Sequence, residues 1–278
     1  MSGRSVAIRT LSLAEIGTLV DWAAEEGWNP GLHDAVAFQA ADPQGFLGAF
    51  VKDQMVAGIS SVDYGGFGFI GLYICRADMR GQGYGRAVWD AGMARLANAT
   101  VGLDGVPAQQ SNYRSMGFVP AYRTYRFSGR LDAKGSPSGL GEVEPHLLPA
   151  LGEFDRRFFP AARPAFLERW VARPHIALVQ VGAAGIQGYG VARECREGFK
   201  IGPLFALDET TATNLLAALC ARCPGEVHID VPEGQGEFAD RLLKAGFSRG
   251  FETARMYRGP APDVDGAGIF GVSTLELG

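Results

Sequence analysis

The amino-acid sequence predicts an α/β protein of two tandem units, each with a central mixed, mostly antiparallel sheet flanked by helices. Strand and helix patterns alternate from residue 4 to residue 128, and the second half repeats their outline. Between the halves, residues 129–141 are rich in Gly, Ser and Pro, which is typical of a linker. We therefore predict a first domain at 1–129, a linker at 130–141 and a smaller second domain at 142–278.

Composition and charge exclude several classes of protein. The 278 residues suffice for two domains of average size, and the apolar fraction of 47% is ordinary for a globular protein with a buried core. The formal net charge of −4 disfavours binding to nucleic acid through the overall field, so we expect no nucleic-acid partner. No run of about 18 apolar residues occurs, and the N-terminus has no signal-peptide pattern, so we expect no membrane association and a cytoplasmic location.

The cysteines support the same compartment. Cys75, Cys195, Cys220 and Cys223 are too sparse for a disulfide scaffold in a chain of this length. Cys220 and Cys223 form a single C-x-x-C pair inside a helical pattern. Because no second pair and no histidine at metal spacing accompany them, we expect no metal site and interpret both as small side chains on one helix face.

The first half has the order β-α-α-β-β-β-α-β-α-β-β. Ser12, followed three residues later by Glu15, predicts a capped helix from about residue 13 to 25. Residues 66–75 carry apolar side chains on both faces, which predicts a central, covered strand. The other expected strands cover residues 6–9, 46–52, 55–62, 99–103, 119–122 and 125–128, and the other helices cover 32–40, a segment ending near 97, and 108–116.

The second half repeats this pattern without repeating the residues. "MGF" at 116–118 has a counterpart "AGF" at 245–247, and each follows a helical pattern and precedes a predicted final strand pair. The strand "FKIGPLFAL" and the helix that follows it, residues 211–222, match the central strand and next helix of the first half. The tail, residues 268–278, predicts one more strand, which we expect to pair across the domains.

A glycine- and arginine-rich turn, "RGQGYGR" at residues 80–86, lies between the central strand and the next helix. The first turn of a helix leaves backbone N–H groups unpaired, and the helix dipole adds partial positive charge there. Glycines let the backbone approach a ligand closely, and phosphate is the usual ligand of such a turn. Arg76, Arg80 and Arg86 add positive charge, so the sequence predicts a phosphate site.

Three phosphate-loop patterns compete for this turn. A P-loop requires a Lys-Ser/Thr end, which is missing, and a Rossmann loop requires G-x-G-x-x-G after the first strand of the fold. Here the spacing differs and several strands precede the turn. The third pattern, R/Q-x-x-G-x-G/A, is satisfied by residues 80–85.

This third pattern resembles the coenzyme A pyrophosphate loop of the GNAT superfamily of N-acetyltransferases. The segment "NYRSMGF", residues 112–118, resembles the second signature of that family, a tyrosine four residues before a Gly-Phe pair. Both signatures occur in the order of the family and on the expected elements. The second half resembles the smaller C-terminal GNAT-like domain of tandem members.

The resemblance implies an acetyl-CoA-dependent N-acetyltransferase in which a primary amine attacks the thioester directly in a ternary complex. The pantetheine arm would pair with the strand, and the pyrophosphate would bind the loop. The implied cofactor-binding residues are Tyr73, Ile74, Cys75, Arg80, Gly81, Gln82, Gly83, Tyr84, Gly85 and Arg86. Tyr113 matches the tyrosine that gives a proton to the leaving thiolate; the alternative is a helix tyrosine packed at the domain surface.

The general base and the acceptor site stay open. Residues 66–75 contain no carboxylate, so the base is a water chain, a backbone carbonyl, or one of the turn candidates Asp63 and Asp104. The acceptor is expected near the turn between the first two helices, where Trp28 would wall a pocket and Asn29 and Asp34 would bind a cationic amine. The same residues also make an ordinary helix-breaking turn.

The second half lacks the residues for this chemistry. Asp208 and Glu209 stand where the loop would be, and their charge would repel a pyrophosphate, although acids cap a helix start well. Leu242 stands in the tyrosine position. We expect one small-molecule amine partner and a monomer or homodimer. The alternatives are a protein lysine or N-terminal acetyltransferase, a non-catalytic acyl-CoA sensor, and a nucleotide binder of unrelated fold.

Overall fold

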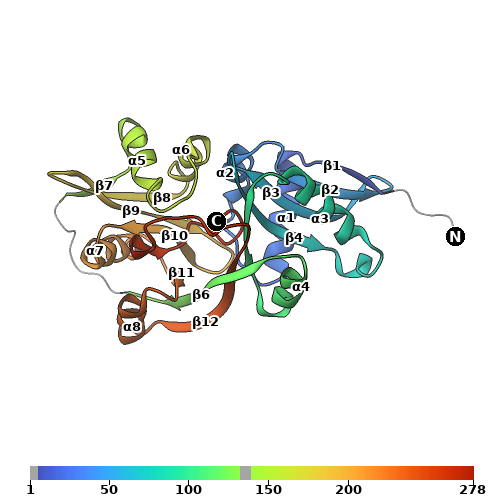
Figure 1. Ribbon diagram of the computed structural model, residues 1–278. Coiled ribbons are helices and arrows are strands. Elements are labelled where there is room, and N and C mark those ends of the chain that lie inside the picture. Colours follow the sequence, from blue (N-terminus) through green and yellow to red (C-terminus); the bar gives the residue numbers. More distant parts are fainter. Residues whose placement is uncertain (1–5, 132–138) are drawn as a thin grey trace.

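A computed structural model describes residues 6–131 and 139–278. Its strands form one continuous mixed sheet in the order β1-β2-β3-β4-β5-β12-β6-β11-β10-β9-β8-β7, with β13 beside β10. Helices lie along both halves of this sheet (Figure 1). The expected fold class, mixed α/β with two similar units, is confirmed.

The elements of the first half follow the expected order closely. They are β1 (Ala7–Thr10), α1 (Leu13–Glu25), α2 (Asp34–Ala41), β2 (Phe46–Val51), β3 (Gln54–Asp63), β4 (Phe67–Cys75), α3 (Tyr84–Arg95), β5 (Thr100–Gly105), α4 (Gln110–Ser115) and β6 (Val119–Gly129). Helix α1 begins as its sequence predicts, because the Ser12 side chain accepts from the Glu15 N–H while the Glu15 side chain accepts from the Ser12 N–H.

The second half repeats the same order. Its elements are β7 (Leu140–Glu142), α5 (Leu148–Asp155), α6 (Pro164–Trp170), β8 (Ile176–Gly182), β9 (Gly185–Glu194), β10 (Phe199–Ala206), α7 (Glu209–Cys220), β11 (Val227–Pro232), α8 (Gly236–Lys244), β12 (Ser248–Arg258) and β13 (Ile269–Gly271). Strand β7 begins inside the expected linker, and residues 132–138 of that linker lie outside the described residues. The domain bounds therefore stay a prediction.

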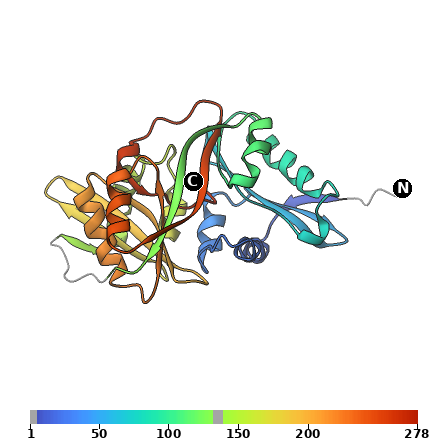
Figure 2. The same ribbon diagram turned by 90° about the horizontal axis from the view of Figure 1, so that it is seen from below.

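The two halves exchange their last long strands. Strand β12 of the second half pairs with β5 of the first, and β6 of the first half pairs with β11 of the second. The exchanged strands also pair with each other, antiparallel, at the centre of the sheet. Figure 2 shows β6 and β12 side by side where the two halves meet. Each half therefore completes its sheet with a strand from the other.

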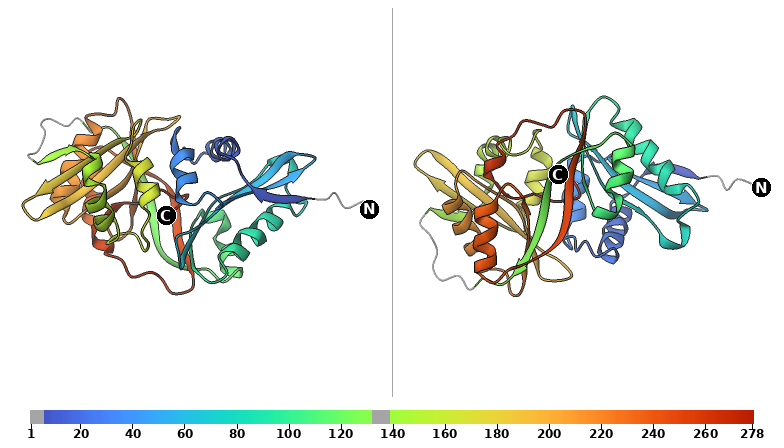
Figure 3. Two further views of the ribbon diagram at one scale, coloured as in Figure 1. Left: turned by 90° about the horizontal axis from the view of Figure 1, so that it is seen from above. Right: turned by 60° about the horizontal axis from the view of Figure 1, so that its bottom comes forward.

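Two expectations about strands are wrong. The two strands expected at 119–122 and 125–128 are one strand, β6, because β12 and β11 occupy its two edges and leave no place for a hairpin. In the tail, only β13 is a strand, and it pairs with β10 of its own half. Residues after β13 do reach the first half, through hydrogen bonds rather than strand pairing: Tyr64 Oη donates to the Leu277 carbonyl at 3.1 Å. Figure 3 shows the chain end between the halves from two directions.

The apolar core joins the halves on one side of the molecule. Helices α1, α2, α5 and α6 contribute to one cluster, in which Phe38 of α2 stacks on Trp170 of α6 with ring centroids 6.0 Å apart. Helix α3 packs in a second cluster in the first half, and α7 packs in a third in the second half. Because apolar burial is the main stabilising term, this shared cluster fixes the halves relative to each other. None of the described helices is long and apolar enough to cross a membrane.

A bulge in β4 creates the opening on which the site depends. Leu72 has a φ of +46°, and the β3–β4 register shifts between Gly58 and Ser60 of the facing strand. Strand β4 pairs in parallel with β5 only along its first four residues, 67–70. Beyond the last paired residue, Ile70, the edge of β4 that faces β5 has no strand partner among the described residues.

Candidate functional site

The divergence of β4 and β5 opens a pocket of about 410 Å³. Residues from β4, the loop after β4, the end of β5 and α4 meet there, together with the turn after α1. They are Glu26, Trp28, Tyr73, Ile74, Cys75, Arg80, Asp104, Val106, Ala108, Gln109 and Tyr113. The structure thus brings together seven of the residues that the sequence singles out.

Strand β4 and the loop are tied to each other at the mouth of this pocket. Arg80 Nε donates to the Cys75 carbonyl at 2.9 Å. Burial raises the pKa of the Cys75 thiol, which disfavours its reactive thiolate form. A Cβ on Gly85 would lie 3.1 Å from Tyr73 Oη, so the glycine helps the helix start to lie close to β4.

The loop has the geometry of an anion cradle. Gly81 and Gly83 have φ values of +75° and +86°, and both are exposed. Gly83 is the N-cap residue of α3 and offers no capping side chain. Within residues 6–131 and 139–278, no backbone or side-chain acceptor takes the N–H groups of Gly81, Gln82, Gly83, Tyr84 or Arg86. These groups are free for an anionic ligand.

The corresponding helix start in the second half is closed. Asp208 is the N-cap residue of α7, and its carboxylate accepts the Thr211 N–H at 2.7 Å. The expected capping role of Asp208 is confirmed. A carboxylate already occupies the position that a phosphate oxygen would need.

The arginines around the loop all have acidic partners. Arg80 pairs with Glu26 at the end of α1. Arg86 pairs with Asp90 at 2.7 Å, and the side chains of Arg86 and Asp90 are 70% and 55% exposed. Exposed pairs of this kind are weak, so these guanidinium groups can exchange a carboxylate for a phosphate.

Tyr113 lies in an aromatic group at the base of the pocket. Its ring stacks on Trp89 of α3 with centroids 5.7 Å apart and meets Phe118 edge-on at 6.3 Å. Burial, and next the nearby Tyr73, raise the pKa of Tyr113 to about 12. The phenol therefore keeps its proton at any neutral pH and is a proton donor rather than a base.

Asp104, at the end of β5, is held by the exchanged strand. Both of its carboxylate oxygens accept from Arg255 of β12 at 2.8 Å, and its side chain is completely buried. Burial alone would lower the pKa of Arg255, but the Asp104 carboxylate raises this pKa well above the ordinary value. Burial raises the pKa of Asp104 and the Arg255 guanidinium opposes this shift, so Asp104 is the fixed counter-ion of Arg255.

Residues 81–86 of the loop do not line the pocket, and neither do three candidates for the acceptor site and the base. Asn29 bonds the backbone of Glu197, donating to its carbonyl at 2.8 Å. Asp34 is completely buried, accepts the Gly31 N–H at 2.9 Å and pairs with Arg193 of β9. Asp63 is exposed in the β3–β4 turn and accepts the Gly65 N–H at 2.8 Å.

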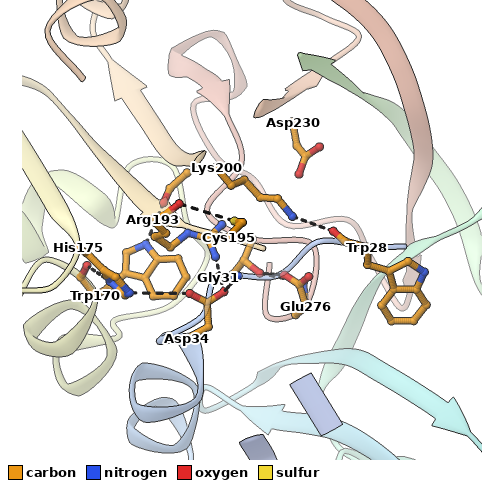
Figure 4. A network of polar contacts seen from close by, with 12 residues as sticks. Trp28, Gly31, Asp34, Trp170, His175, Arg193, Cys195, Lys200, Asp230 and Glu276 are labelled. Atoms are coloured by element: carbon orange, nitrogen blue, oxygen red, sulfur yellow. Dashed lines mark hydrogen bonds and ion pairs between the residues drawn. The ribbon is translucent and has the colours of Figure 1, made fainter. Parts of the chain in front are cut away.

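The turn between α1 and α2 therefore connects the two halves. Figure 4 shows Asp34 beside Arg193, and Trp28 at the far side of the same network. Of the three residues that the sequence places at the acceptor in this turn, only Trp28 reaches the pocket.

A smaller compartment, of about 30 Å³, lies beside this pocket. It shares Trp28, Asp104 and Val106 with the larger pocket and adds Phe251, Thr253, Leu275 and Glu276. Local motifs could not reveal these four residues, because they come from β12 and the tail and reach the site only through the strand exchange.

The C-x-x-C pair takes no part in this site. Cys220 and Cys223 pack in the apolar cluster around α7, and burial raises the pKa of both thiols to about 12. In the part of the chain that the structure describes, no group of three His, Cys, Asp or Glu side chains has the geometry to hold a metal ion.

Comparison with known proteins identifies the family. The model of the acetyltransferase (GNAT) family matches residues 13–119, and that of an acetyltransferase (GNAT) domain matches residues 151–271. The chain is 33% identical over 277 residues to the holothin acyltransferase of Pseudoalteromonas sp. (strain SANK 73390), covering 96% of this chain and 92% of that protein. The chain therefore belongs to the GNAT family of acyltransferases, with a GNAT domain in each half.

Solved structures support the fold. A proposed acetyltransferase from Pyrococcus horikoshii superposes with a TM-score of 0.82 at 22% identity, covering 100% of this chain and 97% of that chain. A tandem GNAT protein from the clavulanic acid biosynthesis pathway superposes with a TM-score of 0.62 at 14% identity, covering 92% and 100%. The tandem arrangement and the GNAT resemblance of the second half are confirmed.

Proposed function

We propose that this protein transfers an acetyl group from acetyl-CoA to a primary amine of a small molecule, by direct attack of the amine in a ternary complex. The observation that carries the proposal is a pocket lined by Tyr113, the unpaired edge of β4 and Arg80, the first residue of the loop. The N–H groups of the following loop residues have no acceptor among the described residues. A relative that covers nearly the whole chain, named for the acylation of holothin, supports an acyltransferase with a small acceptor.

The residues present fit coenzyme A. The diphosphate would bind the N–H groups of residues 81–84 and 86, where the two glycines with positive φ leave open space around the backbone. The pantetheine amides would pair with the edge of β4 at Tyr73, Ile74 and Cys75, since β5 has diverged there. Bound acetyl-CoA supplies an activated thioester carbonyl to the pocket.

Groups of this chain stabilise the negative charges that develop on the carbonyl oxygen and on the leaving thiolate. A backbone N–H on the unpaired edge of β4 donates toward the carbonyl oxygen as negative charge forms on it. Tyr113 holds a proton that a departing thiolate needs, and its stacking on Trp89 fixes the phenol in place. Asp104, which pairs with the buried Arg255, lines the wall of the same pocket.

The experiment that tests this function measures release of free thiol from acetyl-CoA in the presence of a panel of amines. The panel contains holothin, benzylamine, 2-phenylethylamine and a lysine-containing peptide. We expect amine-dependent thiol release with at least one small amine and little with the peptide, and mass spectrometry of the product should show one added acetyl group. Absence of amine-dependent release with every member would contradict the proposal.

Replacing Tyr113 by phenylalanine should lower kcat with the best amine by roughly 100-fold, the usual effect of losing a general acid. Affinity for acetyl-CoA should not change, because the ring still stacks on Trp89. Since the pKa of Tyr113 is about 12, wild-type turnover should not decline from loss of this proton below about pH 10. Steady-state kinetics from pH 6 to pH 10 on both proteins check this; a Tyr113→Phe variant with wild-type kcat would remove Tyr113 from the mechanism.

A further inference from the structure

We propose that Glu276, in the tail that follows β13, is the carboxylate that binds the acceptor nitrogen and takes the proton that the nitrogen loses before attack. This inference rests on the proposed function and adds to it the general base, which the first half does not supply on β4. It also gives the second half a direct part in catalysis.

The tail places Glu276 beside the bulge of β4. Ser60 Oγ on β3 donates to the Glu276 carbonyl at 3.1 Å. A Cβ on Gly71 would collide with the same carbonyl, so the glycine allows the tail to lie directly on β4. The next residue, Leu72, is the residue with positive φ at the bulge. Glu276 is therefore next to the segment of β4 from which β5 has diverged.

The surroundings of Glu276 form the closed end of the site. The smaller compartment that it lines shares Trp28, Asp104 and Val106 with the larger pocket, so the two lie side by side with common wall residues. Trp28, Phe251 and Leu275 give this end apolar walls. The compartment has a volume of about 30 Å³, which leaves room for the nitrogen end of an acceptor whose body lies in the larger pocket.

The carboxylate of Glu276 is buried without a cation of its own. The residue is 4% exposed, and among the described residues its side chain accepts only from Thr274 Oγ1 and belongs to no ion pair within 4.0 Å. A buried carboxylate without a cationic partner is costly, because a single hydroxyl donor replaces only part of the hydration that it has lost. An amine N–H or an ammonium group in the pocket supplies the missing donor.

The cations near Glu276 are all committed to other acceptors. Arg126 on β6 gives both ends of its fork to Asp230 at 2.8 and 2.9 Å. Lys200 on β10 is buried and donates to the Trp28 carbonyl at 2.9 Å, as Figure 4 shows. Burial, followed by the charge of Arg126, lowers the pKa of Lys200. The negative charge of Glu276 opposes this shift.

The other carboxylates of the site are less suited to this role. Both carboxylate oxygens of Asp104 accept from Arg255 on β12. Burial raises the pKa of Asp104, and repulsion between the negative charges of Asp104 and Glu276 adds to this rise. Glu26 pairs with Arg80 at the cofactor end. Glu276 alone combines burial, a place in the pocket wall and an oxygen without a charged donor.

The protons balance with two residues. An ammonium nitrogen gives one proton to Glu276, and its freed electron pair forms the C–N bond while the C–S bond breaks. Tyr113 gives its proton to the sulfur, which keeps the electron pair of the broken bond, and the nitrogen gives its second proton back to Tyr113. The amide and the thiol leave, Glu276 returns its proton to water, and one proton is released for each acetyl group transferred.

The test compares Glu276→Gln with Glu276→Asp and with the matched control Glu168→Gln, which changes an exposed glutamate on α6. Each protein is measured for kcat/KM with the best amine of the panel, for binding of that amine and of acetyl-CoA by calorimetry, and for thermal unfolding. We expect Glu276→Gln to lose about 100-fold or more in kcat/KM for the amine, to bind the amine more weakly, and to bind acetyl-CoA as the wild type does. Glu276→Asp should retain an intermediate activity, and Glu168→Gln should behave as the wild type.

The outcomes separate this inference from the proposed function. If the wild type acetylates amines and Glu276→Gln does so equally well, the role of Glu276 is overturned and the function stands. If Glu276→Gln loses acetyl-CoA binding and thermal stability in the same proportion as activity, Glu276 is a structural residue and the inference is again overturned. If the wild type releases no thiol with any amine, both fall. If Glu276→Gln does not fold, the inference requires Glu276→Asp to lose kcat/KM for the amine at unchanged affinity for acetyl-CoA; full activity in that variant overturns it.

Discussion

Replacing Arg255 by alanine is expected to lower the free energy of unfolding by about 3–5 kcal/mol, because it leaves Asp104 as an uncompensated buried charge. The two side chains are 8% and 0% exposed, and both carboxylate oxygens accept from the guanidinium at 2.8 Å. Since Arg255 belongs to β12 and Asp104 to β5, the change weakens the contact between the exchanged strand and the first half. Urea denaturation followed by circular dichroism measures the effect.

The matched control is an ion pair that water surrounds. Arg157 and Asp265 pair at 3.0 Å with 48% and 43% of their side chains exposed, so Arg157→Ala should cost less than about 1 kcal/mol. A double variant, Arg255→Met with Asp104→Leu, should recover most of the lost stability because no buried charge remains. If Arg255→Ala falls within about 1 kcal/mol of the wild type, the exchanged strand is not held by this pair.

Replacing Gly83 by valine is expected to weaken binding of acetyl-CoA by about tenfold or more, which corresponds to about 1.4 kcal/mol. Gly83 has a φ of +86°, a conformation that costs a side-chain-bearing residue roughly 1–2 kcal/mol and a β-branched one more. A Cβ at this position would meet no atom within 4 Å, so the loss comes from the altered loop backbone and not from a clash in the core. Calorimetric titration with acetyl-CoA gives the change in Kd.

The same substitution at Gly65 provides the control for this prediction. Gly65 has a φ of +81° and is exposed in the β3–β4 turn, and a Cβ there would also meet no atom within 4 Å, but the residue does not belong to the loop between β4 and α3. Gly65→Val should therefore carry a similar backbone strain and leave the affinity for acetyl-CoA unchanged. Equal effects of the two substitutions on affinity would mean that the loop has no special part in binding.

Local sequence signals predicted the elements and the loop well. The Ser12–Glu15 pair defines the start of α1 through contacts between residues three apart, and Asp208 caps α7 in the same way. The glycines of the loop also act locally, since a positive φ depends on the residue itself. The tyrosine position in α4 follows from its distance to the Gly-Phe pair, and the structure places Tyr113 in the pocket.

Signals that depend on distant partners could not be predicted. Nothing in residues 119–129 distinguishes a hairpin from one strand whose two neighbours come from the other half. Asn29 and Asp34 have the chemistry of amine ligands, but Glu197 and Arg193, more than 150 positions away along the sequence, engage them instead. Glu276 belongs to a tail with no motif, and its place in the pocket depends on the whole fold.

The most direct test of the account is the stoichiometry with which the wild-type chain binds acetyl-CoA, measured by isothermal titration calorimetry. The free N–H groups after β4 and the carboxylate-capped start of α7 predict one bound molecule per chain, with binding lost or strongly weakened in Gly83→Val. Two molecules per chain, or no measurable binding to a folded wild-type protein, would contradict it.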